Sequence, residues 1–191
     1  VWSVVAAEFV LSLLLFFRST ETVLVTVPGV CGFGLNFTVD GFRSIYTVIA
    51  ALMWLVTGIF SPEYFAHYRN RNRYYLFLLV TLGATEAVFL SGDLYTTFIF
   101  FEIMSISSYV WVAQEETEEA LKAGVTYLAI SVIGGMVMLM GLFLFNNAVG
   151  TLHMDEVYDA VQKVWPEQSS RIYTAGFLML VGFGAKAGMF P

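Results

Sequence analysis

Charged residues and cysteine are both scarce in this 191-residue sequence. Asp, Glu, Lys and Arg make up 13% of the chain, which is less polar surface than a soluble domain needs. Cys31 is the only cysteine, so neither an internal disulfide nor a metal cluster built on thiolates is possible. The two histidines, His67 and His153, lie far apart, which argues against a metal site with several ligands. A net charge of −6 offers no basic face for phosphates, and we expect no nucleic-acid partner.

Apolar residues, in contrast, are abundant and occur in long runs. They make up 58% of the chain, and the mean hydropathy is +0.75. Six runs have the length that one bilayer crossing needs, and helix is the default because a backbone in lipid must satisfy its own polar groups. These runs do not alternate as barrel strands do. We therefore predict an all-α, polytopic transmembrane helix bundle with spans at about Val1–Phe17, Phe42–Phe60, Tyr74–Ser91, Leu94–Ala113, Ala123–Phe145 and Ile172–Phe190.

Both ends of the sequence suggest an internal fragment. Val1 is not a start methionine, no small-residue cleavage site follows the first apolar run, and Pro191 falls inside the last one. We expect residues 1–191 to form one transmembrane domain within a longer subunit.

Two short segments between the first two spans do alternate. Thr22–Val27 and Leu35–Asp40 are rich in β-branched and apolar residues at every second position, and Pro28-Gly29 is a turn signal. This pattern predicts a β-hairpin that covers one face of the membrane domain.

Basic residues set the expected orientation. They crowd the short Ser61–Arg73 loop, which by the positive-inside rule is cytoplasmic. They are His67, Arg69, Arg71 and Arg73. The Gln114–Lys122 loop then lies inside, whereas the hairpin and the long Asn146–Arg171 loop lie outside. Within that outer loop, Gly150–Gln162 has a helical pattern and is expected to lie along the membrane surface.

Glu102 is an ionisable residue in the middle of the predicted fourth span. A charge near the bilayer centre costs about 2.5–3.5 kcal/mol on insertion scales, so such residues usually face a bundle interior or a wet cavity. Asp93 is expected to cap the outer end of this span, which places Glu102 about 13 Å along the helix. Its sequence neighbours are apolar, so any counter-charge must come from elsewhere. A purely structural, hydrogen-bonded carboxylate is the alternative.

Lys186 is the cation within the predicted sixth span. Helix-weakening residues surround it, and interrupted helices occur at membrane depth where the backbone lines a cavity. These residues are Gly182, Gly184, Gly188 and Pro191. The alternative, a face of glycines for helix packing, leaves the ammonium unexplained. We predict a broken helix around a lysine that can gain and lose a proton.

Four weaker candidates accompany this pair. Glu86 lies near the outer end of the third span, and Glu8 lies in the middle of the first. Lys122 begins the fifth span at the inner surface, and Thr126 follows it one turn later. We find no phosphate-binding glycine loop, nucleophile elbow, haem motif or iron–sulfur motif in the sequence, and we expect no cofactor.

Two motifs resemble one family of membrane proteins. Gly92–Glu102 resembles the glutamate-bearing helix of the antiporter-like subunits of respiratory complex I, and looks closest to those of Mrp-type cation/proton antiporters and membrane-bound hydrogenases. Gly182–Pro191 resembles the lysine-bearing broken helix of the family, and Asn147–Met154 is similar to its outer loop. The hairpin also fits, so the resemblance covers the whole chain.

The resemblance implies a role for each charged motif. The six spans would be roughly the second to seventh of about fourteen, and the glutamate–lysine pair of the family would be Glu102 and Lys186. In the family this glutamate faces a neighbouring subunit or domain and tunes the lysine, which passes protons along a hydrated axis. Many members carry a lysine where this sequence has Thr126; Lys122 offers a substitute from the same face.

The leading hypothesis is therefore translocation of H⁺ or Na⁺ by an antiporter-like subunit. The parent assembly would be a cation/proton antiporter or an oxidoreductase complex of the NADH-quinone oxidoreductase or hydrogenase type, with the redox centres on other subunits. Expected partners are other membrane subunits and the lipid of a prokaryotic inner membrane. Two alternatives stay open: a non-conducting subunit that anchors a redox module, and a secondary transporter of a small organic ion.

Overall fold

A computed structural model describes residues 1–30, 32–66 and 70–189. The predictions that concern Cys31, His67, Arg69 and Pro191 lie outside these residues. The described chain contains six helices and one antiparallel hairpin. The elements are α1 (Trp2–Arg18), β1 (Val23–Val27), β2 (Leu35–Val39), α2 (Gly41–Tyr64), α3 (Arg71–Phe89), α4 (Leu94–Val112), α5 (Glu118–Val149) and α6 (Met154–Lys186).

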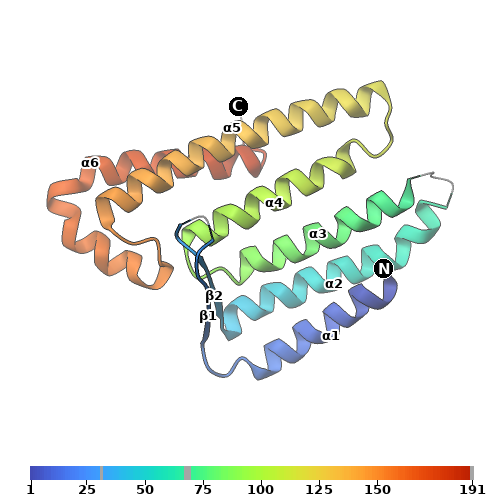
Figure 1. Cartoon of the computed structure of the whole chain (residues 1–191), viewed down its shortest axis with the longest axis horizontal. Helices are drawn as coiled ribbons and strands as arrows, with labels where there is room; N and C mark the ends of the chain where they lie inside the picture. The colour runs from blue at the N-terminus through green and yellow to red at the C-terminus, as the bar shows by residue number, and fades with distance from the viewer. Residues whose placement is uncertain (31, 67–69, 190–191) are drawn as a thin grey trace.

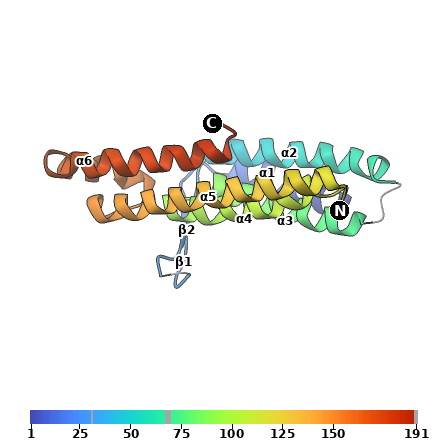
Figure 2. The same cartoon turned by 90° about the horizontal axis from the view of Figure 1, so that it is seen from above.

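The helices follow one another side by side. Figure 1 shows α1, α2, α3 and α4 in chain order, with α5 next to α4 and the second part of α6 against α5. The hairpin projects to one side of the bundle (Figure 2). In it, Val23 pairs with Val39 and Val27 with Leu35, which confirms the predicted hairpin.

Side-chain caps start three of these helices. Asp40, Asp93 and Thr117 each accept a hydrogen bond from a backbone N–H in the first turn of α2, α4 and α5 respectively. Such caps satisfy donors that have no partner inside the helix. The predicted cap by Asp93 is confirmed: its Oδ1 lies 2.6 Å from the Thr96 nitrogen.

The boundary of the last helix differs from the sequence prediction. A loop with a helical segment over about Gly150–Gln162 was expected between Asn146 and Arg171. Instead α5 continues to Val149, and α6 runs from Met154 to Lys186, which joins the helical segment to the predicted sixth span. Apolar residues at helical spacing, Val157, Val161 and Val164, pack against the core and make this stretch amphipathic. Figure 1 shows α6 curving back so that its two parts run in different directions. Pro166, which lacks an N–H to donate, lies inside this helix.

Six helices match the six predicted spans in number and approximate position. Within the described parts of the chain, two of them, α2 and α5, are long and apolar enough to cross a membrane by length and composition alone. Large apolar side chains also lie exposed on the outside of the bundle, among them Phe42, Ile133 and Met136. Exposed apolar surface of this kind is typical of contact with lipid or with another protein.

Hydrogen bonds at the two ends of the bundle hold α4 in place. At one end Arg73 pairs with Glu116, 2.5 Å apart, which brings the start of α3 to the α4–α5 loop. At the other end the Asn36 side chain of β2 donates to Asp93, and its backbone N–H donates to Thr96 Oγ1 at 2.9 Å. The hairpin and the α3–α4 connection therefore fix where α4 begins, and with it the depth of Glu102.

Candidate functional site

The structure brings Glu102 and Lys186 together. Glu102 lies on α4 and Lys186 is the last residue of α6, 84 positions later in the chain, yet Lys186 Nζ donates to Glu102 Oε1. The Lys186 side chain is 2% exposed and that of Glu102 is 21% exposed. Two charges at such low exposure are stable only as a pair, because each alone loses its hydration without compensation.

The backbone at the C-terminal end of α6 also stabilises the positive charge of Lys186. The N–H of Met189 donates to the carbonyl of Gly184 at 2.8 Å, and Gly188 has a φ of +72°. This is the Schellman arrangement, in which a left-handed glycine closes the helix. Carbonyl groups at a helix C-terminus carry partial negative charge, which favours a cation there. The helix thus ends at the lysine whose charge its C-terminus stabilises.

Serine and phenylalanine complete the surroundings of the ammonium group. Lys186 Nζ donates to Ser105 Oγ at 3.0 Å, and Ser105 is one turn of α4 beyond Glu102. The same nitrogen lies 5.0 Å from the ring centre of Phe101, within the range of a cation–π contact. The ammonium therefore has a charged, a polar and an aromatic partner, all on α4.

Glycines on α5 and α6 let these groups approach one another. A Cβ on Gly135 of α5 would overlap the Glu102 carboxylate. A Cβ on Gly182 would lie 2.5 Å from the Met138 Cβ, and one on Gly134 would lie 2.9 Å from the Ala185 Cβ. The small residues therefore bring α6 close to α5 and leave room for the carboxylate between α4 and α5.

The glycines predicted for a broken helix have separate roles in the described chain. Gly182 allows the close contact with α5, and Gly188 supplies the left-handed turn that ends α6. A Cβ on Gly184 would meet the Met189 side chain, which folds back over the turn. Helix α6 thus ends at Lys186, within the segment where the break was predicted. That a helix resumes beyond Met189 stays a prediction.

Lys122 and Thr126 are not part of this cluster. Lys122 lies in the second turn of α5, where its exposed side chain pairs with Glu118 at 2.7 Å. The exposed Thr126 hydroxyl donates to the Lys122 carbonyl. Both side chains are exposed on the bundle that this chain forms, and their place in a proton path stays a prediction.

Sequence reasoning missed the roles of Phe101, Ser105, Ser108 and Gly135. Ser105 lies three residues after Glu102, so its place on the same side of the helix was a readable signal, and Ser108 follows one turn later. Ser108 Oγ lies 2.6 Å from Tyr127 Oη of α5, so polar groups continue from the pair along the α4–α5 contact. Gly135 carried no signal, because only the folded chain shows which glycine faces Glu102.

Comparisons with known proteins identify a family and several relatives. Residues 91–191 match the family described as NADH:quinone oxidoreductase/Mrp antiporter, TM. A Na⁺/H⁺ antiporter subunit from Alkalihalophilus pseudofirmus is 28% identical over 159 residues, covering 83% of this chain and 32% of the relative. A probable K⁺/H⁺ antiporter subunit from Rhizobium meliloti is 28% identical, covering 83% of this chain and 29% of the relative. The chain thus spans about a third of the length of these relatives.

Solved structures share the fold. A membrane-bound sulfane sulfur reductase, an archaeal respiratory complex, contains a chain that matches 96% of this one with a TM-score of 0.84 and 20% identity. Respiratory complex I from Thermus thermophilus matches 95% with a TM-score of 0.72 and 21% identity. This chain covers 38% and 37% of those two chains.

Proposed function

This chain belongs to the NADH:quinone oxidoreductase/Mrp antiporter transmembrane family, and we propose that it moves protons, or a cation exchanged for protons, through a membrane. The observation that carries the proposal is the Lys186–Glu102 ion pair, which joins two helices inside the bundle. A structural subunit has no need of a buried ammonium, whereas a proton relay requires a group that can exchange a proton at depth.

Charge at Glu102 controls the proton on Lys186. While Glu102 is ionised, its attraction and the C-terminal end of α6 favour the protonated lysine. Neutralising or withdrawing the carboxylate removes that attraction, and the apolar surroundings then favour release of the proton. Glu102 retains some exposure at 21%, so an approaching charge from a neighbouring helix or subunit can reach it. A change of charge at Glu102 thereby changes the proton affinity of Lys186, and this couples the two residues.

The six helices serve as the membrane-spanning scaffold of this relay. The family is one of transmembrane proteins, and the chain is an integral membrane protein. We propose that all six helices cross the bilayer, with the first part of α6 lying along its surface and an interruption after Lys186.

The parent assembly is proposed to be a multi-subunit membrane complex. The related chains belong to a Na⁺/H⁺ antiporter and to respiratory complexes. We propose that this domain is part of a longer chain of about fourteen helices in a prokaryotic membrane, that other membrane subunits are its partners, and that it has no redox centre of its own.

A glycine substitution tests whether the pair geometry matters for transport. In Gly135→Ala the new methyl group overlaps the Glu102 carboxylate, which must move away from its place beside Lys186. We expect proton translocation by the assembled complex in vesicles to fall about tenfold, a barrier change of about 1.4 kcal/mol. Gly176→Ala is the matched control, because a Cβ on Gly176 of α6 meets nothing within 4 Å. Equal rates in the two variants would argue against the proposal.

The orientation is tested by labelling from each side. In a variant with Cys31 replaced by Ser, we expect Asn72→Cys to react with an impermeant thiol reagent only from the cytoplasmic side. Asn72 is exposed at the start of α3, in the basic loop region. Glu21→Cys, exposed at the opposite end of the bundle beside the hairpin, should react only from outside. Labelling of Asn72→Cys in intact cells would reverse the proposed topology.

A further inference from the structure

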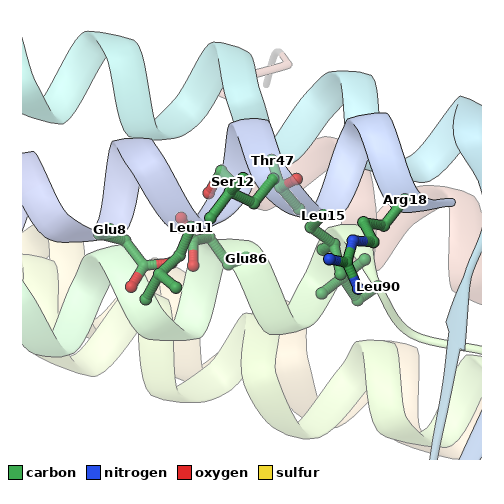
Figure 3. A pocket seen from close by; sticks show the side chains of 9 residues that line it. Glu8, Leu11, Ser12, Leu15, Arg18, Thr47, Glu86 and Leu90 are labelled. Carbon is green, nitrogen blue, oxygen red and sulfur yellow. The ribbon is translucent and has the colours of Figure 1, made fainter.

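A second pair of ionisable side chains lies in a cavity between α1, α2 and α3. The cavity has a volume of about 430 Å³ and mostly apolar walls, with Glu8 and Ser12 from α1, Thr47 from α2 and Glu86 from α3 among its lining residues. Figure 3 shows the Glu8 and Glu86 side chains meeting at one end of it, and Arg18 at the other. These residues take no part in the Lys186 site, which is built from α4, α5 and α6.

The two carboxyl groups are in direct contact. The Glu8 and Glu86 side chains meet at one end of the cavity, close enough for their carboxyl groups to interact (Figure 3). Carboxylate oxygens are acceptors only, so two carboxyls can bond to one another only when one of them carries a proton. If both carboxyls were ionised they would also repel one another strongly, because the apolar walls of the cavity screen the repulsion poorly.

One oxygen of the pair also lacks a partner. Glu86 Oε1 is buried and has no hydrogen-bond partner among the described residues, although it belongs to a side chain that lines the cavity. A buried carboxylate oxygen left unpaired is costly, whereas the cost falls sharply when the carboxyl is protonated and neutral. This second observation also points to a bound proton at Glu86.

We propose that Glu8 and Glu86 form a second proton-binding site, in which two carboxyls share one proton. One carboxyl donates its O–H to an oxygen of the other, and the pair carries a single negative charge.

The cavity provides the route by which this proton exchanges. It extends from the carboxyl pair to Arg18, the last residue of α1, and Leu90, which follows α3. Glu8 and Arg18 are ten residues apart, about 15 Å of helix, so the route runs from the bundle interior towards its hairpin end. Arg18 is exposed there, and its positive charge is available to balance the single charge of the pair. The proposed proton site at Glu8 and Glu86 does not depend on the Lys186 relay, and the two proposals can be tested separately.

Infrared difference spectroscopy of the full-length protein in its complex tests the shared proton. In the wild-type protein at neutral pH we expect the carbonyl band of a protonated glutamate. The band should shift on transfer to D₂O and again when the glutamates carry ¹³C, and neither measurement requires a substitution. Glu86→Gln and Glu8→Gln should each weaken the band by up to one carboxylic acid per chain, because the remaining carboxylate can accept a hydrogen bond from the amide and no longer needs the proton.

Glu63→Gln, an exposed carboxyl near the end of α2, is the matched control and should leave the band unchanged. Equal bands in the wild type and in both pair variants would overturn the proposal. Absence of the band at neutral pH, in buffers with and without Na⁺, would also overturn it, since neither carboxyl would then carry a proton.

Discussion

Replacing Glu102 by Gln is expected to stop most proton translocation while the complex still assembles. Glutamine keeps the shape of the side chain, and its amide oxygen can still accept from Lys186. The charge, however, is lost, and at an effective dielectric constant of 20 the attraction between unit charges 4 Å apart is about 4 kcal/mol. Without that attraction the apolar surroundings disfavour the protonated lysine. We expect the translocation rate, measured as proton uptake by vesicles, to fall at least about tenfold.

A conservative variant and a surface control complete this experiment. Glu102→Asp keeps the charge and shortens the side chain by one methylene, so a part of the rate should return. Glu119→Gln, which neutralises an exposed carboxylate at the start of α5, should leave the rate unchanged. A Glu102→Gln complex that pumps as fast as Glu119→Gln would mean that the charge at Glu102 does not tune the lysine.

Local signals in the sequence were sufficient for most of the fold. Apolar runs predicted six helices, and the alternation on either side of Pro28-Gly29 predicted the hairpin. Asp93 was identified as a cap because its side chain acts on the backbone only three residues away. These features depend on neighbours in the chain, which a sequence displays directly.

The error at α6 arose where two environments meet in one helix. Composition becomes polar over Met154–Arg171, so this stretch was assigned to an outer loop, although a helical pattern was recognised over Gly150–Gln162. The apolar residues in this stretch nevertheless recur at helical spacing and pack against the core. A stretch with one apolar face on the bundle and a polar opposite face has too little apolar character to be counted as part of a span, and so the length of α6 was underestimated.

The contacts of the site could be predicted only in part. Glu102 and Lys186 were identified because buried charges are costly and therefore conspicuous in apolar runs. Their pairing within one chain was left open, since nothing in the sequence relates positions 84 residues apart. The same holds for Glu8 and Glu86, which were noted separately and which only the packing of α1 against α2 and α3 brings together.

Replacing Lys186 by Ala is expected to abolish proton translocation. The substitution removes the ammonium group that Glu102 and Ser105 hold in place, and the methyl group left behind can neither bind nor release a proton. Breaking a buried ion pair by removing one partner typically costs about 3–5 kcal/mol, so some loss of stability is also expected. Lys186→Met separates the two effects, because it retains most of the apolar stem and fills the space. Both variants should translocate at the background rate of empty vesicles.

The most direct test of this account is proton uptake by vesicles that contain equal amounts of assembled wild-type, Lys186→Met or Lys163→Ala complex. Lys163 is an exposed lysine on the first part of α6, and its removal controls for a general loss of positive charge. We predict normal uptake in the wild type and in Lys163→Ala, and background uptake in Lys186→Met. Uptake at the normal rate in an assembled Lys186→Met complex would contradict the relay and leave the chain with a structural role in the membrane.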